Sequence, residues 1–183
     1  MLYVVRHGKT DYNKEELIMG RIDKPLNKEG LEEAYEVSKI LSSIDIDLII
    51  SSPLIRAKQT ANIINQEKCV ELKIDYRLQE RNLGFLEGKN YLPVEKNNDL
   101  WDINKNISCN KIETMKELKG RVYGFLDELI NEYSDKNILL VTHGGVSAMI
   151  NCYFNNTLYD GTISNKFLKN CEIGTYDIKQ KRR

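Results

Sequence analysis

The chain of 183 residues has few of the residues from which metal or cofactor sites are commonly built. It has two histidines and one tryptophan, and none of its four cysteines forms a C-x-x-C pair. We therefore expect reduced structural thiols, no metal site and no cofactor. There is no long apolar run, so no membrane partner is expected, and the expected location is cytoplasmic.

The chain also lacks an excess of either charge, with 27 Lys and Arg against 27 Asp and Glu. A general polyanion binder carries a basic excess, so a nucleic acid partner is not expected, and any anion site must be a local cluster. Hydrophobic residues make up 41% of the chain and charged residues 30%. This composition and length favour a single globular domain over residues 1–183.

Short apolar segments alternate with amphipathic ones along the chain. Strands are expected at 2–6, 47–51, 71–75, 137–143 and 172–178. Helices are expected at 28–43, from Pro53 onward with Ser52 as the N-cap, at about 114–133 and from near Gly145. Asn27 is the expected N-cap of the first helix, and Thr114 and Glu117 fit a capping box. This alternation predicts an α/β fold with a mainly parallel central sheet.

Residues 82–111 break this pattern, because Gly, Asn, Pro, Lys and Asp replace the apolar periodicity. The segment is longer than an ordinary connection, so we expect a lid or specificity loop. It contains the only tryptophan, Trp101. That side chain is expected to anchor the loop by packing, with stacking on a substrate as the alternative.

Both histidines directly follow an expected strand, and each is followed by glycine. His7 follows "LYVVR" and His143 follows "ILLVT". A single histidine in such a place is commonly a hydrogen-bonded structural residue. The carboxyl ends of parallel strands meet at one edge of a sheet, so the two histidines are expected to lie at the same edge. Two histidines in that position indicate a functional site.

Two arginines accompany the histidines. Arg6 precedes His7, and Arg56 falls in the first turn of the helix after strand 47–51. Arginine makes bidentate bonds to phosphate, and a helix N-terminus favours anions. Arg56 alone would be read as a surface ion pair, but beside the two histidines it favours an anion site.

Six segments resemble, in order, the motifs of the histidine phosphatases, which are also called the phosphoglycerate mutase-like superfamily. They are "RHGKTDYN" (6–13), "DKPLNKEG" (23–30), "SSPLIRAKQTA" (51–61), "LQERNLGFLEG" (78–88), "VTHGGV" (141–146) and "LKNCEI" (168–173). Together they span nearly the whole chain. The resemblance implies a three-layer α/β/α fold.

The resemblance also implies the roles of individual residues. His7 would attack phosphorus and become phosphohistidine, and Glu80 would be the general acid and then the base. The phosphoryl group would be held by Arg6, Asn13, Arg56, His143 and Gly144. A nucleophilic histidine needs one bare nitrogen, so its other nitrogen is expected to donate to a backbone carbonyl. His143, facing phosphate, is expected to be charged.

Some positions leave a choice open. The block 78–88 contains two glutamates, Glu80 and Glu87, and either could be the general acid or a solvated loop charge. The position in the block favours Glu80 as the acid. Lys9 stands where the family usually has Glu or Gln. It either extends the anion site or, as we expect, is an ordinary exposed lysine.

The favoured function is a metal-independent phosphomonoesterase acting on a small phosphorylated metabolite. One alternative is a phosphoglycerate mutase, which must exclude water, and the short stretch from Glu80 to His143 offers little material for that. The other is a non-catalytic phosphate-ligand sensor, although no expected catalytic residue is missing. A metallohydrolase could be imagined from His7, His143, Glu80 and Asp11, but their spacing matches no metal-binding motif. A monomer or homodimer is expected, and the residues do not select a substrate.

Overall fold

The computed structural model describes residues 1–90, 98–102, 104–105, 111–156 and 162–181. Its centre is one five-stranded sheet in the order β3-β2-β4-β1-β5. The strands are β1 (Leu2–Arg6), β2 (Leu48–Ser51), β3 (Glu71–Ile74), β4 (Ile138–Thr142) and β5 (Ile173–Tyr176). All neighbouring pairs are parallel except β1 with β5, so the predicted mainly parallel sheet is confirmed.

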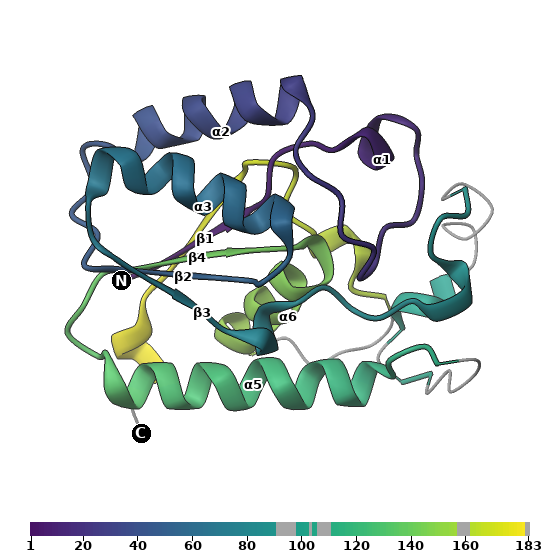
Figure 1. Ribbon diagram of the computed structural model, residues 1–183. Helices are drawn as coiled ribbons and strands as arrows, with labels where there is room; N and C mark the ends of the chain where they lie inside the picture. The colour runs from purple at the N-terminus through teal and green to yellow at the C-terminus, as the bar shows by residue number, and fades with distance from the viewer. Residues whose placement is uncertain (91–97, 103, 106–110, 157–161, 182–183) are drawn as a thin grey trace.

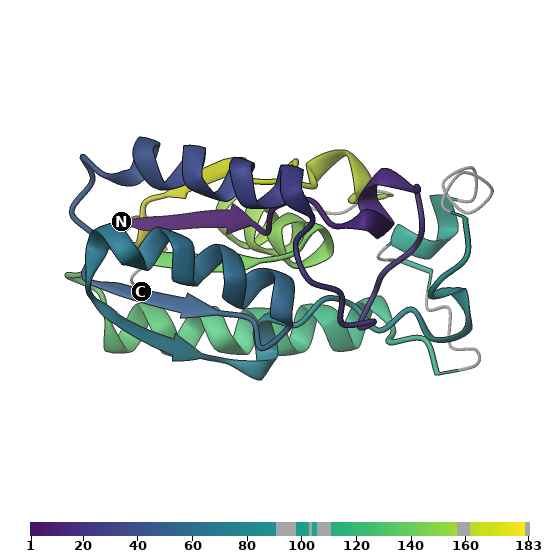
Figure 2. The same ribbon diagram turned by 45° about the horizontal axis from the view of Figure 1, so that its top comes forward.

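Helices cover both faces of this sheet. The helices are α1 (Asp11–Lys14), α2 (Lys28–Leu41), α3 (Ile55–Lys68), α5 (Met115–Glu132) and α6 (Gly144–Asn155). Short 3-10 turns are η1 (Tyr76–Leu78), η2 (Gly84–Leu86), η3 (Asn98–Trp101), η4 (Ser164–Lys166) and η5 (Ile178–Lys181). Helices α2 and α3 lie on one face and α5 and α6 on the other (Figures 1 and 2). The expected three layers are therefore present.

Alternation along the strands divides the core between the two faces. In β2, Leu48 and Ile50 pack with α5 and α6, whereas Ile49 packs with α2 and α3. Strand β4 alternates in the same way. A strand covered on both sides has no polar face, which is why these segments read as continuous apolar runs.

Local capping signals fix two helix starts as expected. The side chain of Asn27 accepts a hydrogen bond of 2.8 Å from the Gly30 amide at the start of α2. Thr114 and Glu117 form the predicted capping box of α5. Helix α2 ends two residues before its expected end.

The predicted start of α3 at Ser52 and Pro53 is wrong. The helix begins at Ile55, and Leu54 occupies the N-cap without a side-chain hydrogen bond. The Ile55 amide instead donates to Asp23 at 2.7 Å. A carboxylate distant in sequence thus replaces the local cap, and Ser52 is left for another role.

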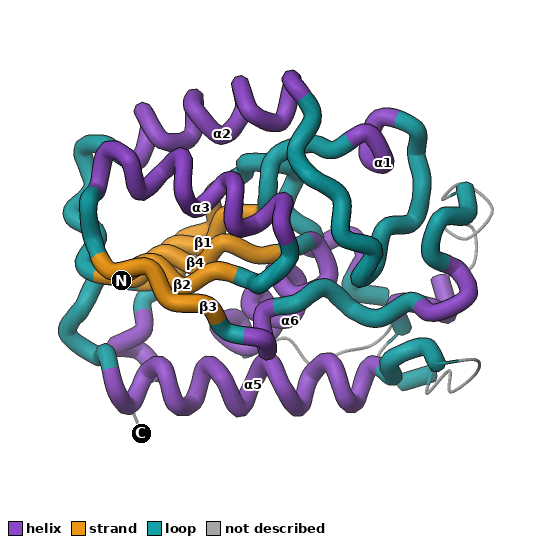
Figure 3. The backbone as a smooth tube through the Cα atoms, viewed as in Figure 1, coloured by secondary structure: helices purple, strands orange, loops and turns teal. Residues whose placement is uncertain are grey.

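The carboxyl ends of β1, β2 and β4 point toward the same edge of the sheet, where α1 and the following loop lie (Figure 3). Arg6 pairs with Thr142 in the register of β1 and β4, so His7 and His143 emerge side by side. The predicted lid, 82–111, lies partly outside the described residues, at 91–97, 103 and 106–110. In the part of the chain that is described, no helix is both long and apolar enough to cross a membrane.

Candidate active site

The His7 imidazole is buried and is fixed by a contact at each ring nitrogen. Its Nδ1 lies 2.7 Å from the Gly8 carbonyl oxygen, and its Nε2 lies 3.1 Å from Nε of Arg56. A carbonyl only accepts and a guanidinium only donates, so Nδ1 carries the proton and Nε2 presents its lone pair. Burial, with the charges of Arg56 and Arg6, lowers the pKa of His7 well below its ordinary value. The ring is therefore neutral.

The backbone on either side of His7 is held by close packing. The Gly8 amide donates to Thr60 Oγ1 at 3.1 Å, and the Asn170 side chain donates to the His7 carbonyl at 2.8 Å. A Cβ added to Gly30 would lie 2.6 Å from the Lys9 nitrogen. Glycine at position 30 thus lets α2 contact the loop that carries His7. This close contact explains why the segment "DKPLNKEG" ends in glycine.

Both predicted arginines are anchored to backbone carbonyls. Arg56 is 1% exposed and donates from Nη1 to Ile22 at 2.9 Å and from Nη2 to Gly20 at 2.8 Å. Burial lowers the pKa of Arg56 to about 10, so it remains a cation at neutral pH. Arg6 donates from Nη1 to the Leu168 carbonyl at 2.9 Å. Each guanidinium has five N–H groups, so this anchoring leaves donors for an anion.

His143 is the N-cap residue of α6, and its ring centroid lies 5.1 Å from that of His7. Its Nε2 lies 2.7 Å from Ser52 Oγ, which is the role of the serine that was wrongly expected to cap α3. Its buried Nδ1 has no hydrogen-bond partner among the described residues. Burial, then the charge of Arg56, lowers the pKa of His143 well below its ordinary value. Without a bound anion the ring is therefore neutral, and the expectation that it is charged when it faces phosphate stays a prediction.

Glu80 is fixed through both its side chain and its backbone. Its carboxylate accepts hydrogen bonds from the amides of Gly145 at 3.1 Å and Arg81 at 2.8 Å. Its carbonyl accepts from Arg21 Nε and from Arg121 Nη2, each at 3.2 Å. These contacts aim the carboxylate at the pocket from a segment that contains no helix or strand of its own.

The two arginines that bind the Glu80 carbonyl share one buried carboxylate, that of Glu113. Its Oε1 lies 2.6 Å from Nε of Arg121, and its Oε2 lies 3.3 Å from Nη2 of Arg21. The Glu113 side chain is only 9% exposed. Sequence reasoning did not find this arrangement, because no spacing connects residues 21, 80, 113 and 121.

The two open positions fall outside the pocket. Glu87 accepts hydrogen bonds from the amides of Arg21 at 2.9 Å and Leu83 at 3.0 Å, so it joins two loops. Lys9 forms ion pairs with Glu29 and Glu33 on α2. Of the two glutamates in the block, the pocket contains Glu80.

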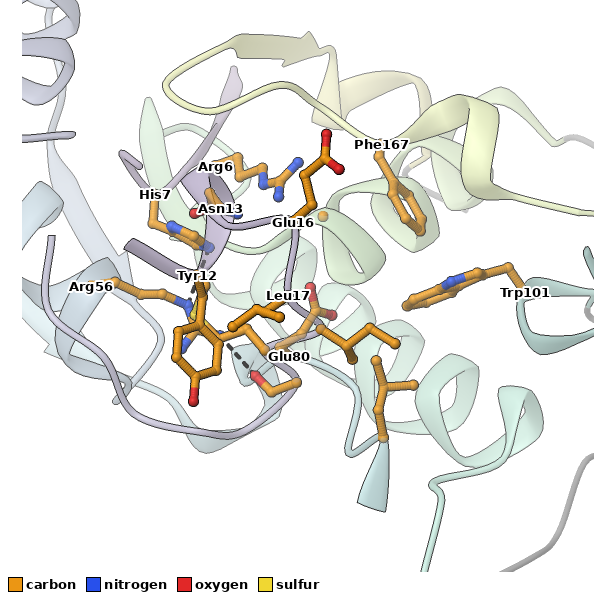
Figure 4. A pocket seen from close by; sticks show the side chains of 15 residues that line it. Arg6, His7, Tyr12, Asn13, Glu16, Leu17, Arg56, Glu80, Trp101 and Phe167 are labelled. Atoms are coloured by element: carbon orange, nitrogen blue, oxygen red, sulfur yellow. Dashed lines mark hydrogen bonds between the residues drawn. The ribbon is translucent and has the colours of Figure 1, made fainter. Parts of the chain in front are cut away.

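These elements enclose a cavity of about 370 Å³ (Figure 4). The predicted site residues on its wall are Arg6, His7, Asn13, Arg56, Glu80 and Gly144. Asn13 belongs to α1, where its Oδ1 accepts a hydrogen bond from the Thr10 amide at 3.1 Å. His143 lies behind this wall, fully buried against His7. Among the described residues, no group of three or more His, Cys, Asp and Glu side chains could bind a metal ion.

Comparison with known proteins shows that the chain is related to the histidine phosphatases. The model of the histidine phosphatase superfamily (branch 1) matches residues 2–183. The uncharacterized phosphatase PhoE of Bacillus subtilis is 36% identical over 77% of this chain and 70% of its own. The probable phosphoglycerate mutase GpmB of Salmonella typhi is 31% identical over 98% of this chain and 85% of its own.

A solved structure agrees in the fold. YhfR of Bacillus stearothermophilus superposes with a TM-score of 0.78 at 27% identity, over 87% of this chain and 81% of that one. The sequence matches and the fold agree with each other. The chain therefore belongs to the histidine phosphatase superfamily and is an enzyme of the phosphatase type.

Proposed function

We propose that the chain is a metal-independent phosphomonoesterase that hydrolyses a small phosphorylated metabolite through a phosphohistidine on His7. The observation that carries this proposal is the state of the His7 ring. It is neutral, its Nδ1–H is bound to the Gly8 carbonyl, and its unprotonated Nε2 accepts a hydrogen bond from Arg56 at the wall of the cavity. An unprotonated nitrogen next to fixed cations is what attack on a phosphate ester requires.

In the first step, Nε2 of His7 forms a bond to phosphorus as the ester P–O bond breaks. Glu80 gives its proton to the leaving oxygen, so the product is a neutral alcohol. Arg6, Arg56 and Asn13, with the first amide of α6 at Gly144, bind the phosphoryl oxygens. Fixed donors of this kind stabilise the transition state without reorganising. The incoming anion favours protonation of His143, which then becomes a further donor.

In the second step, Glu80 takes a proton from water, and the water oxygen attacks phosphorus. The P–N bond breaks, inorganic phosphate leaves, and His7 returns to its neutral form. Glu80 ends the step protonated, ready for the next ester. One carboxylate therefore serves both steps, as acid and then as base.

The test measures phosphate release from phosphoglycerates, sugar phosphates, nucleotides and p-nitrophenyl phosphate in the presence of EDTA. Turnover of a related group of esters is expected, with an acid-labile phosphoenzyme trapped by rapid quenching. His7→Asn should abolish both signals. Turnover that EDTA removes, or a phosphoenzyme that persists in His7→Asn, would contradict the proposal.

A second candidate is a phosphoglycerate mutase, favoured by the likeness to a probable enzyme of that kind. It would return the phosphoryl group from His7 to a bound glycerate instead of to water. Interconversion of 2- and 3-phosphoglycerate that outpaces phosphate release would favour it. Tight binding of phosphorylated compounds with no turnover would favour a sensor instead.

A further inference from the structure

The side of the cavity that receives the leaving group is marked by Glu80, and an indole ring lies directly beside it. A Cβ added to Gly145 would lie 2.7 Å from Glu80 Oε1 and 2.8 Å from Cζ3 of Trp101. The Glu80 carboxylate and the edge of the Trp101 ring therefore both border the small space next to Gly145. In the proposed mechanism, a group attached to the oxygen that Glu80 protonates would lie in the part of the cavity that Glu80 and Trp101 share; Figure 4 draws both side chains.

Trp101 is part of a fixed apolar wall. Its ring packs edge-on against Phe167, with centroids 4.7 Å apart, and the buried Arg81 guanidinium lies 5.2 Å from its centre. Its carbonyl accepts a hydrogen bond of 3.1 Å from the Ile163 amide. Leu83 continues the apolar lining. A rigid aromatic surface offers dispersion and ring contacts to an apolar group and no bonds to an anion.

The charged side chains among the described residues of the cavity wall are Arg6, Arg56, Glu16 and Glu80. Arg6 and Arg56 lie at the end with His7, where they are used for the phosphoryl group. Glu16, an exposed residue just after α1, brings a carboxylate to the rim (Figure 4). Its backbone has a φ of 55°, in the left-handed region that favours glycine. A carboxylate on the cavity wall repels a second anionic group on the substrate.

We infer that the substrate carries its phosphate on an apolar or aromatic alcohol and has no second anionic group. This inference rests on the proposed function, because the role of Glu80 locates the leaving group. It separates this enzyme from one adapted to phosphoglycerates, in which the alcohol portion itself bears a carboxylate.

The test compares two unactivated esters of nearly equal length, pentyl phosphate and 4-(phosphonooxy)butanoate. They differ in whether the chain ends in a methyl group or a carboxylate. The wild-type kcat/KM is expected to be about tenfold or more higher for the pentyl ester. Benzyl phosphate should be at least as good as pentyl phosphate.

Two charge reversals isolate the effect of Glu16. Glu16→Lys should narrow the preference for the pentyl ester about fivefold or more. Glu15→Lys makes the same change at the exposed neighbouring residue, which does not line the cavity. It should leave the preference unchanged, so a narrowing in both variants would point to bulk charge and contradict the inference.

The wall is tested by Trp101→Ala and Trp101→Leu. Both should lower kcat/KM for benzyl phosphate, the alanine variant by about tenfold to a hundredfold. Phosphorylation of His7 by phosphoramidate, which has no alcohol portion, should be unaffected. If Trp101→Ala does not fold, the leucine variant and the Glu16 pair decide.

The outcomes separate the inference from the proposed function. If phosphoramidate leaves His7 unlabelled in the wild type, the phosphohistidine mechanism fails. If His7 is labelled but the carboxylate ester is hydrolysed as fast as the pentyl ester, the mechanism stands and the inferred substrate class is wrong.

Discussion

The carboxylate of Glu113 is the point at which two arginines are tied to the backbone of Glu80, and its removal should be felt in the chemistry of the leaving group. The carboxylate accepts from Arg121 at 2.6 and 3.0 Å, from Arg21 at 3.3 Å and from the Asn82 amide at 3.0 Å. Glu113→Ala would remove the acceptor that these donors share, whereas Glu113→Gln keeps one oxygen.

The expected loss of stability follows from the exposure of each partner. Breaking a buried ion pair costs about 3–5 kcal/mol, whereas an exposed pair contributes about 1 kcal/mol or less. The Arg121 side chain is 16% exposed and that of Arg21 is 37% exposed. The less exposed ion pair, between Glu113 and Arg121, contributes most of the loss. Glu113→Ala should therefore lower the free energy of unfolding by about 3 kcal/mol. Glu113→Gln should lower it by about half as much.

The expected effect on catalysis is selective. Without the Glu113 carboxylate, the two arginines that bind the Glu80 carbonyl are held less firmly, and a misplacement of the order of 1 Å can cost about a hundredfold in rate. Glu80 is needed most when the leaving alkoxide is poor. Glu113→Gln should therefore slow phosphoenzyme formation from an alkyl phosphate about tenfold or more, and from p-nitrophenyl phosphate about threefold or less.

Rapid-quench measurement of the phosphoenzyme in single turnovers gives both rates, at a temperature where each variant is folded. Glu117→Gln is the matched control, since this carboxylate caps the same helix from an exposed position. It should lower stability only slightly and leave the ratio of the two rates unchanged. Equal slowing with both esters in Glu113→Gln would refute the positioning role.

Three further predictions concern other parts of the molecule. His7 and His143 have lowered pKa values when folded, so the unfolded chain binds more protons below about pH 6.5. Unfolding measured in urea should show stability falling on acidification, by about 1.4 kcal/mol per pH unit for each histidine, and His7→Asn should lower that slope by one histidine's share. Gly30→Ala, whose Cβ would lie 2.6 Å from a backbone nitrogen beside the His7 loop, should abolish phosphohistidine formation, and wild-type rates would contradict that packing. Burial raises the pKa of Cys171 to about 12, so iodoacetamide at pH 8 should alkylate it more slowly than the exposed Cys69, as peptide mass mapping would show.

The parts of the fold that sequence reasoning predicted are those with local signals. Asn27 and Thr114 cap their helices through bonds within one turn, so three or four residues suffice to recognise them. The meeting of His7 and His143 needed one further step, because parallel strands align their carboxyl ends. The register of Arg6 with Thr142 then places the two rings next to each other.

The parts that were missed depend on residues distant in the chain. Ser52 followed by Pro53 is typical of a helix start, but Asp23 caps α3 and Ser52 binds His143. The state of His143 without phosphate was not predicted from the sequence. Burial and neighbouring cations lower its pKa before any phosphate arrives. These effects exist only once the sheet has assembled.

The contact between Arg56 and His7 unites these observations. In the proposed mechanism the Nε2 lone pair of His7 attacks phosphorus, and without substrate this lone pair accepts a hydrogen bond from Arg56 Nε. Burial, together with the guanidinium 3.1 Å away, keeps the ring neutral. The carbonyls of Gly20 and Ile22 hold the guanidinium in place. In this mechanism a phosphoryl oxygen would take over the Nε–H and free the lone pair, which would couple activation of His7 to substrate binding.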